Sequence, residues 1–171
     1  MSRQKTLDLL STGKTFWNRW RRENAEIQAI EPDLHAADLH GMDLNGADLH
    51  EADLTEANLQ GADLRKADLR ETDLRHANLQ NANLSDANLL KARLHGANLC
   101  GANLCRTNLK GADFSNADLG GADLDGAILD KANFDEANLS RGDLGEADSN
   151  KLLKAKERIL ASVAVQSGKA A

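Results

Sequence analysis

A five-residue repeat runs without a slip from residue 33 to residue 148 of this 171-residue chain. If Leu34 is taken as the first centre, position i, every fifth residue as far as Leu144 is Leu, except at Phe114 and Phe134. Position i−2 is nearly always Ala, and position i−1 is Asp or Asn at every centre except at Arg93 and Ile128. The repeating unit is Ala-Asp/Asn-Leu-x-x, and this period limits what the chain can fold into.

A period of five excludes both a long helix and a long strand. In an α-helix successive leucines would be rotated by about 140° and would leave no apolar stripe. In a flat strand an odd period would point successive leucines to opposite faces. The pattern fits a chain that is extended from i−2 to i and bends at i+1 and i+2, so that every Leu faces one axis. Coils of this kind stack as short parallel strands around a core of Leu and Ala.

Glycine at position i+2 indicates how many bends close one coil, because a turn that recurs on one face recurs with the coil period. At intervals of twenty residues the i+2 positions hold Gly41, Gly61, Asn81, Gly101, Gly121 and Arg141. A grouping by fifteen residues spreads the glycines evenly over all faces instead. The sequence thus predicts twenty residues and four sides per coil. Phe114 and Phe134 are twenty residues apart, so they should stack on one side.

The run Ala52-Asp53-Leu54-Thr55-Glu56-Ala57-Asn58-Leu59-Gln60-Gly61 resembles the pentapeptide-repeat proteins. The resemblance covers about two-thirds of the chain. It implies an all-β solenoid, a right-handed quadrilateral parallel β-helix with i−2 and i inward and the other positions outward. At about 4.8 Å per coil, about six coils make a rod roughly 28 Å long. Because many members are cyanobacterial, we expect a bacterial, cyanobacterial-type protein.

The chain divides into a helical N-terminal cap at 1–31, the β-helix at 32–148, and a C-terminal helix with a loose tail at 149–171. An open coil end is an exposed sheet edge that invites polymerisation, so we expect both ends to be covered. Pro32 would end the N-terminal helix. Its apolar residues recur at roughly helical spacing and are Phe16, Trp17, Trp20, Ile27 and Ile30. Alternatively, this basic, Trp-containing segment lies on an acidic membrane surface.

The C-terminal segment presents an apolar helical face opposite several lysines. The residues of this face include Leu152, Leu153, Ile159, Leu160 and Val163. The helix either caps the rod alone or also pairs with a second copy. The resemblance supports the second possibility, because family members that bind a topoisomerase use C-terminal elements to dimerise. A monomer and a homodimer both remain open.

Charge is distributed unevenly, with a net charge of −13 at residues 31–148 and positive flanks on both sides. We name three candidate surfaces. The acidic face holds Asp53, Glu56, Asp113, Asp135 and Glu136 on one side of the rod. The basic girdle holds Arg93, Arg106 and Lys110 in a coil without acids. The glycine face is the least charged side and is the candidate interaction face, with Gly41, Gly61, Asn81, Gly101 and Gly121. Leu90 and Ile128 are apolar residues at outward positions of the repeat, and both lie on the fourth side of the rod. They form a second candidate patch.

No residue pattern indicates catalysis, a cofactor or a metal, so we expect a protein that is not an enzyme. The histidines point outward from different sides or different coils, which argues against a closed metal site. They are His35, His40, His50, His76 and His95. Cys100 and Cys105 occupy adjacent sides that face different directions, so an intramolecular disulfide is disfavoured. Free cysteines fit a reducing compartment.

A rigid acidic rod favours a non-enzymatic protein–protein interaction module or regulator with a protein partner. The alternative is a DNA mimic that binds a type II topoisomerase such as DNA gyrase. The resemblance implies it, because gyrase-protecting pentapeptide-repeat proteins share the fold and the acidic surface. The rod carries one net negative charge per about 2 Å, against about 1.7 Å in duplex DNA. Direct nucleic-acid binding is not expected. We also expect a cytoplasmic protein without a membrane span, because the chain lacks a long apolar run.

Overall fold

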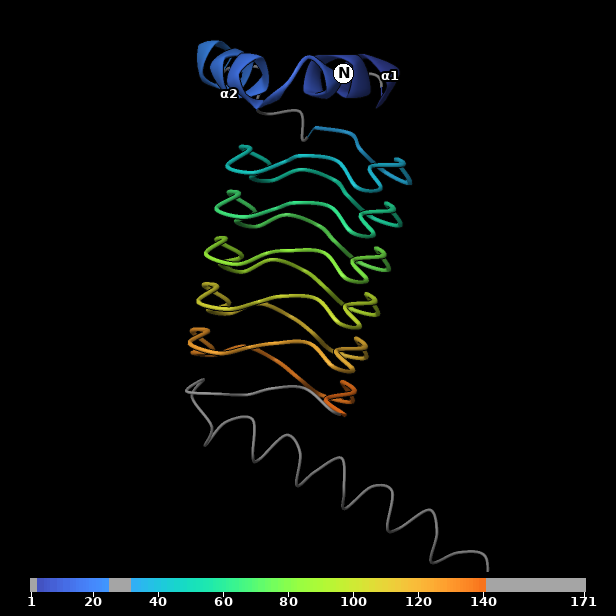
Figure 1. Cartoon of the computed structure of the whole chain (residues 1–171), viewed down its shortest axis with the longest axis vertical. Helices are drawn as coiled ribbons and strands as arrows, with labels where there is room; N and C mark the ends of the chain where they lie inside the picture. Colours follow the sequence, from blue (N-terminus) through green and yellow to red (C-terminus); the bar gives the residue numbers. More distant parts are fainter. Residues whose placement is uncertain (1–2, 25–31, 141–171) are drawn as a thin grey trace, which may run out of the picture.

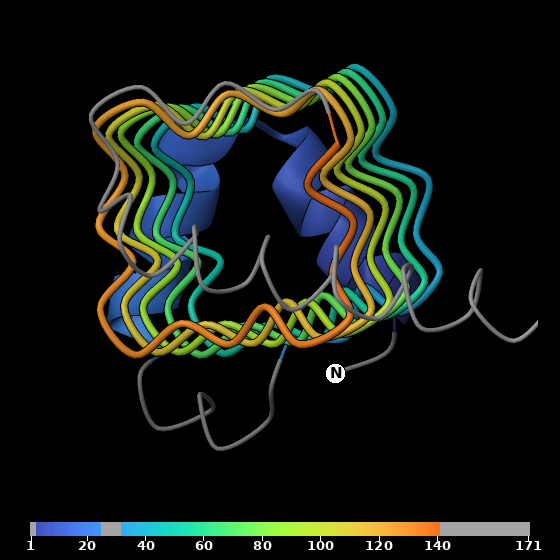
Figure 2. The same cartoon turned by 90° about the horizontal axis from the view of Figure 1, so that it is seen from below.

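The computed structural model describes residues 3–24 and 32–140, which form two helices and a stack of coils (Figure 1). Parallel bridges join each i−1 residue to the residue twenty positions later, from Asp33 with Asp53 to Asp118 with Asn138. Seen along its axis, the stack is four-sided (Figure 2). The predicted coil of twenty residues and four sides is confirmed. Five complete coils run from residue 32 to residue 131, and the described chain ends within the next one.

Each side of a coil is tied to the next coil by three backbone hydrogen bonds. In one example, the amide of Leu54 donates to the carbonyl of Asp73 at 2.8 Å. The amide of Glu56 donates to the carbonyl of Arg75 at 3.0 Å, and the amide of Asp73 donates back to Ala52 at 3.0 Å. Every strand is thereby reduced to a single bridged residue between two turns. The sheet therefore extends along the stacking axis, through hydrogen bonds between coils, and each strand is short.

Every corner of the rod is the same β-turn, in which the amide of i+3 donates to the carbonyl of i, as from Ala57 to Leu54 at 3.1 Å. All described i+2 residues from 36 to 136 have φ between +51° and +72°, and only eight of them are Gly. Such a left-handed third residue is the mark of a type II turn. The predicted coil period is correct, but glycine does not set it. All four corners adopt the same conformation whichever residue they hold.

The Asp or Asn side chain at i−1 holds the corner that follows it. Its Oδ1 accepts a hydrogen bond from the amide of i+1, as Asn103 Oδ1 does from Cys105 at 2.9 Å. Every described Asp and Asn at i−1 makes this bond. A short side chain with an acceptor oxygen is what this turn requires. The repeat restricts i−1 to Asp and Asn for this structural reason.

The interior is filled by the Leu, Phe and Ala residues of positions i and i−2. The rings of Phe114 and Phe134 stack with centroids 5.0 Å apart and planes 2° from parallel, as predicted. Thr72 and Thr107 replace Ala at i−2 and are completely buried. Their hydroxyls donate to Leu49 O at 2.9 Å and to Leu84 O at 3.0 Å, so both polar groups are satisfied.

At the N-terminal end lie α1 (Arg3–Ser11) and α2 (Lys14–Glu23), with Gly13 between them at φ +99°. This corrects the expectation of one continuous helix. The predicted apolar face is confirmed at Trp17, which is buried, but it is wrong at Phe16, which is 39% exposed and lies under the Arg19 guanidinium. Leu10, which the prediction did not include, is buried as well. Part of the predicted elements lies outside the described residues. These are Ile27, Ile30, Arg141, Leu152, Leu153, Ile159, Leu160 and Val163. No helix in the described parts of the chain is long and apolar enough to cross a membrane.

Candidate interaction surfaces of the rod

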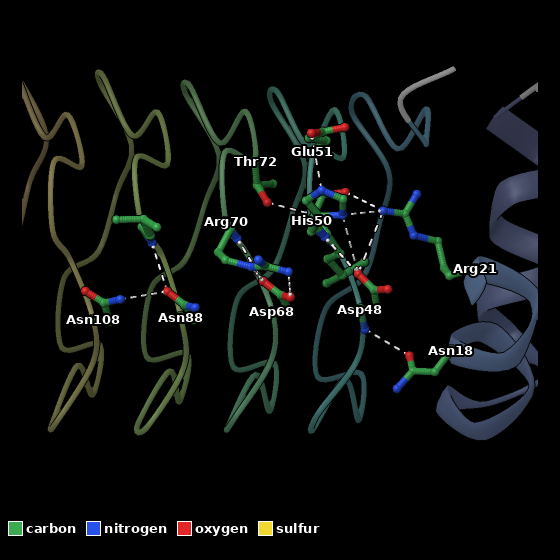
Figure 3. A network of polar contacts seen from close by, with 12 residues as sticks. Asn18, Arg21, Asp48, His50, Glu51, Asp68, Arg70, Thr72, Asn88 and Asn108 are labelled. Carbon is green, nitrogen blue, oxygen red and sulfur yellow. Dashed lines mark hydrogen bonds and ion pairs between the residues drawn. The ribbon is translucent and has the colours of Figure 1, made fainter. Parts of the chain in front are cut away.

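Within the described residues no coil precedes the one at 32–51, and side chains of α2 bind backbone groups of this first coil (Figure 3). The indole Nε1 of Trp17 donates to the carbonyl of Asp48 at 2.6 Å. Asn18 Nδ2 donates to the carbonyl of Gly46 at 2.8 Å, and Asn18 Oδ1 accepts from the amide of Asp48 at 2.9 Å. Trp17 is therefore bound to the rod rather than presented to a membrane surface.

The glycine face consists of residues 37–41, 57–61, 77–81, 97–101 and 117–121, which the bridges place on one side. Its three central repeats contain no charged residue. Asn58 Nδ2 donates to Asp38 Oδ1 at 3.1 Å, and Asn78 Nδ2 donates to Asn58 Oδ1 at 3.3 Å, so side chains of the first three coils are joined along the axis. A Cβ on Gly101 would meet Asn81 Oδ1 at 2.5 Å, so glycine there makes room for the amide of the preceding coil.

The acidic face is not continuous in the structure. Asp53 and Glu56 lie in the second coil, whereas Asp113, Asp135 and Glu136 lie in the last two described coils. Between these two groups, Arg75 and Arg93 both pair with Asp73, at 2.7 Å and 3.1 Å. The bridges place the predicted residues on one side, but two arginines divide them into two acidic patches.

Two acids of this side, Asp113 and Asp73, have lowered pKa values. Burial tends to raise the pKa of Asp113, but hydrogen bonds from Ser115 and Asn133 outweigh burial and hold that pKa below its usual value. Burial also tends to raise the pKa of Asp73, but hydrogen bonds from Arg75 outweigh it and leave that pKa lowered. Both carboxylates therefore stay negative at neutral pH.

The basic girdle does not form a free positive belt. Arg93 pairs with Asp73, Arg106 with Asp86 at 2.8 Å, and Lys110 with Asp130 at 3.4 Å. Each partner lies twenty residues away and thus directly above or below in the stack. The hydrogen bond from Arg106 also lowers the pKa of Asp86. The coil without acids is neutralised by the acids of its two neighbours.

A second set of ion pairs lies within single corners and was missed by the sequence reasoning. Arg65 contacts Asp63 at 2.6 Å, and Arg75 contacts Asp73 at 2.7 Å. Both arginines sit two residues after the acid and bind both of its carboxylate oxygens. The signal was present in the sequence as Arg at i+1 after Asp at i−1.

The histidines and cysteines provide no metal centre in residues 3–24 and 32–140, where no group of three suitable ligands occurs. His76 and His95 lie on different coils, yet their rings meet edge to face with centroids 5.6 Å apart. Both cysteines are free thiols. Burial, together with the carboxylate of Asp123 at 2.8 Å, raises the pKa of Cys105 to about 11.

The predicted apolar patch is reduced to one residue. Ile128 is 54% exposed because it occupies an outward i−1 position. Leu90 is only half-buried and is not an exposed apolar residue. An isolated Ile on a surface does not indicate an interface.

Stacked coils of four pentapeptides, with Leu and Ala inside and a polar exterior, define a repeat solenoid. The family model for pentapeptide repeats matches residues 33–70, 67–105 and 106–145 with eight copies. The chain belongs to the pentapeptide-repeat family, and its solenoid is a right-handed quadrilateral β-helix.

Several solved structures are similar to this chain. The pentapeptide repeat protein Rfr23 from the cyanobacterium Cyanothece 51142 is 31% identical, with a TM-score of 0.64 over 71% of this chain and 97% of that one. HetL from the cyanobacterium Nostoc sp. strain PCC 7120, involved in heterocyst differentiation regulation, is 36% identical, with a TM-score of 0.46 over 67% of this chain and 58% of that one. The plasmid-mediated fluoroquinolone resistance protein QnrB1 is 18% identical, with a TM-score of 0.31 over 68% of this chain and 76% of that one. None of the curated proteins compared matches the chain.

Proposed function

We propose that this protein is a non-enzymatic protein–protein interaction module or regulator that binds a protein partner on its glycine face. The observation that carries the proposal is the absence of charge from the three central repeats of that face, 57–61, 77–81 and 97–101. The other three sides carry the ion pairs of the rod. A partner therefore desolvates no charged group of the central repeats when it docks there, which avoids the main cost of burying polar surface.

The backbone bonds support the same function. Each side is held by three hydrogen bonds per pair of coils, so the face is ordered before a partner arrives. A preorganised surface loses little conformational entropy on binding. The amides of Gln60 and Gln80 stand on this face and can exchange hydrogen bonds with a partner backbone. We place this activity in the bacterial cytoplasm, where the free thiols of Cys100 and Cys105 stay reduced.

The chemistry of the thiols supports a role without catalysis. Burial, followed by the hydrogen bond to Asp118, raises the pKa of Cys100, and the pKa of Cys105 is raised to about 11. A catalytic cysteine needs the opposite shift, because the thiolate is the nucleophile.

The alternative is a DNA mimic that binds a type II topoisomerase such as DNA gyrase. Asp113 of the acidic face supports it, because hydrogen bonds from Ser115 and Asn133 hold the pKa of its carboxyl below the usual value. The pairing of Asp73 with Arg75 and Arg93 weakens it, because a duplex presents an uninterrupted row of negative charge.

The test is capture of partners from a native host lysate at low and high salt, with matched variants. Gly61→Arg places a long cation on the glycine face, and Lys66 and Arg106 show that this corner position tolerates one at positive φ. Gly111→Arg makes the same change on another side, where the added Cβ meets only an ordinary contact with Lys91. We expect Gly61→Arg to lose a partner that the wild type and Gly111→Arg retain. Capture of this partner by the wild type should depend little on salt.

The acidic face is tested in the same assay by Glu56→Lys combined with Glu136→Lys. Both residues occupy exposed i+2 corners, so the fold tolerates the change. Loss of a salt-sensitive topoisomerase subunit in this variant, with retention in Gly61→Arg, would replace the proposed function by DNA mimicry.

A further inference from the structure

The attachment of α2 to the rod converges on one histidine of the first coil (Figure 3). Arg21 is only 2% exposed, and its Nη2 donates to the carbonyl of His50 at 2.6 Å. The same nitrogen lies 3.0 Å from His50 Nδ1 and 3.8 Å from Asp48 Oδ1. A buried cation of the helix is thus held directly against a titratable ring of the rod.

The contact requires one protonation state of His50. A guanidinium has only donors, so Nδ1 must accept and cannot carry a proton. The proton of the neutral ring is then on Nε2, which lies 3.2 Å from Glu51 Oε1. A second proton would be added at Nδ1, where it would face the guanidinium as donor against donor and cation against cation.

Other charged groups surround His50, and they belong to the rod itself. Asp48, with Oδ1 at 3.9 Å from Nδ1, and Glu51 belong to the same coil as His50. Asp68 of the next coil interacts electrostatically with the ring and is itself bound by Arg70. These groups stay beside His50 whether α2 is attached or released, so Arg21 is the charge that distinguishes the two states.

We propose that α2 is an acid-sensitive latch over the first edge of the rod, which opens when His50 becomes protonated. The attached state binds this proton less tightly than the released state, because only the attached state places Arg21 against Nδ1. By linkage, attachment weakens as pH falls through the range in which histidine titrates. Release uncovers the amide of Asp48 and the carbonyls of Asp48 and His50, which correspond to the groups that pair with the preceding coil in the rest of the rod.

The chain contains its own reporter for this step. Its two tryptophans, Trp17 and Trp20, are both in α2, and it has no tyrosine. Trp17 is completely buried in the attached state. Tryptophan emission and acrylamide quenching therefore follow release of α2, while circular dichroism follows the rod. Between about pH 7.5 and 5.5 we expect the released fraction of the full chain to rise several-fold, with the rod intact.

Three variants separate this latch from general acid sensitivity. His50→Gln keeps a neutral acceptor for Arg21 and should remove the transition, and its emission at high pH checks that α2 is attached. Arg21→Met should attach α2 more weakly but without the pH dependence. The control, His95→Gln, changes the same repeat position three coils away, where the ring contacts Ser115, and should keep the wild-type transition. A wild type without a transition in this range, or a transition that survives His50→Gln, would overturn the proposal.

Discussion

The backbone amide of Asp48 donates to the side-chain oxygen of Asn18 at 2.9 Å, in the place of a bond that the rest of the rod makes with backbone alone. One coil later, the amide of Asp68 donates to the carbonyl of Ala47, also at 2.9 Å. In the first coil a carboxamide from α2 supplies the acceptor instead of a backbone carbonyl. The edge of a parallel sheet is thus completed by a helix side chain.

Removal of this acceptor should loosen the helices without unfolding the rod. Asn18→Ala leaves a partly buried amide without its bond and should weaken attachment of α2 by about 1–2 kcal/mol. Denaturant titration followed by tryptophan emission measures the attachment. Asn18→Asp keeps the acceptor for Asp48 but loses the donor to Gly46, so it should have a smaller effect. Equal stability of the alanine variant and the wild type would contradict the role of Asn18.

The left-handed corners predict opposite effects for one pair of substitutions. Ala36 is exposed with φ +51°, so Ala36→Gly relieves strain and should stabilise the protein by about 0.5–1 kcal/mol after the entropy cost of glycine. Gly121 has φ +72° and open space around its Cα, so Gly121→Ala adds strain alone and should destabilise by a similar amount. Chemical denaturation measures both. Changes of the same sign in the two variants would refute the argument.

The thiol of Cys105 should be unreactive at neutral pH. Burial and the carboxylate of Asp123 raise its pKa to about 11, so its thiolate fraction at pH 8 is roughly a hundredfold below that of a free cysteine. In a Cys100→Ser background, the rate of alkylation by iodoacetamide should be low and should rise about tenfold per pH unit up to about pH 11. Asp123→Asn should speed the reaction. A rate equal to that of free cysteine would show that the carboxylate and burial do not act on the thiol.

The corner ion pairs should contribute stability that acid removes. Burial tends to raise the pKa of Asp68, but hydrogen bonds from Arg70 outweigh it and leave that pKa lowered. A carboxyl group whose pKa is lower in the folded state stabilises the fold at pH values above its pKa in the unfolded state. This contribution is lost as pH falls through the pKa of the folded state. Asp68→Asn keeps the corner acceptor, and it should cost under about 1 kcal/mol at pH 7, because Arg70 is 45% exposed, and less at pH 3.

The control for this prediction is the same change in an Arg70→Met background, where the charge of Asp68 has lost its partner. There Asp68→Asn should change the free energy of unfolding far less at pH 7. An equal cost in both backgrounds would assign the effect to the corner itself rather than to the ion pair.

The sequence by itself determined the repeating five-residue unit and the core, and the predicted four sides are correct although glycine does not account for them. Repetition makes these features local, because each Leu and Ala meets the same neighbours in every repeat. The stacking of Phe114 on Phe134 followed from their separation alone. The conformation of the corners did not follow, because three backbone bonds per side impose a positive φ even on residues such as Glu71 that disfavour it.

The tertiary structure decided which charges are paired and which face of the N-terminal segment is buried. The basic girdle is paired with acids twenty residues away along the chain, and the composition of the girdle coil alone does not reveal these pairs. Its residues are Arg93, Arg106 and Lys110. Trp17 rather than Phe16 is buried because the free carbonyl of Asp48 needs a donor, which an indole has and a phenyl ring lacks. Periodic packing is written into each repeat, whereas the end of the rod and its ion pairs depend on groups that meet only after the coils have stacked.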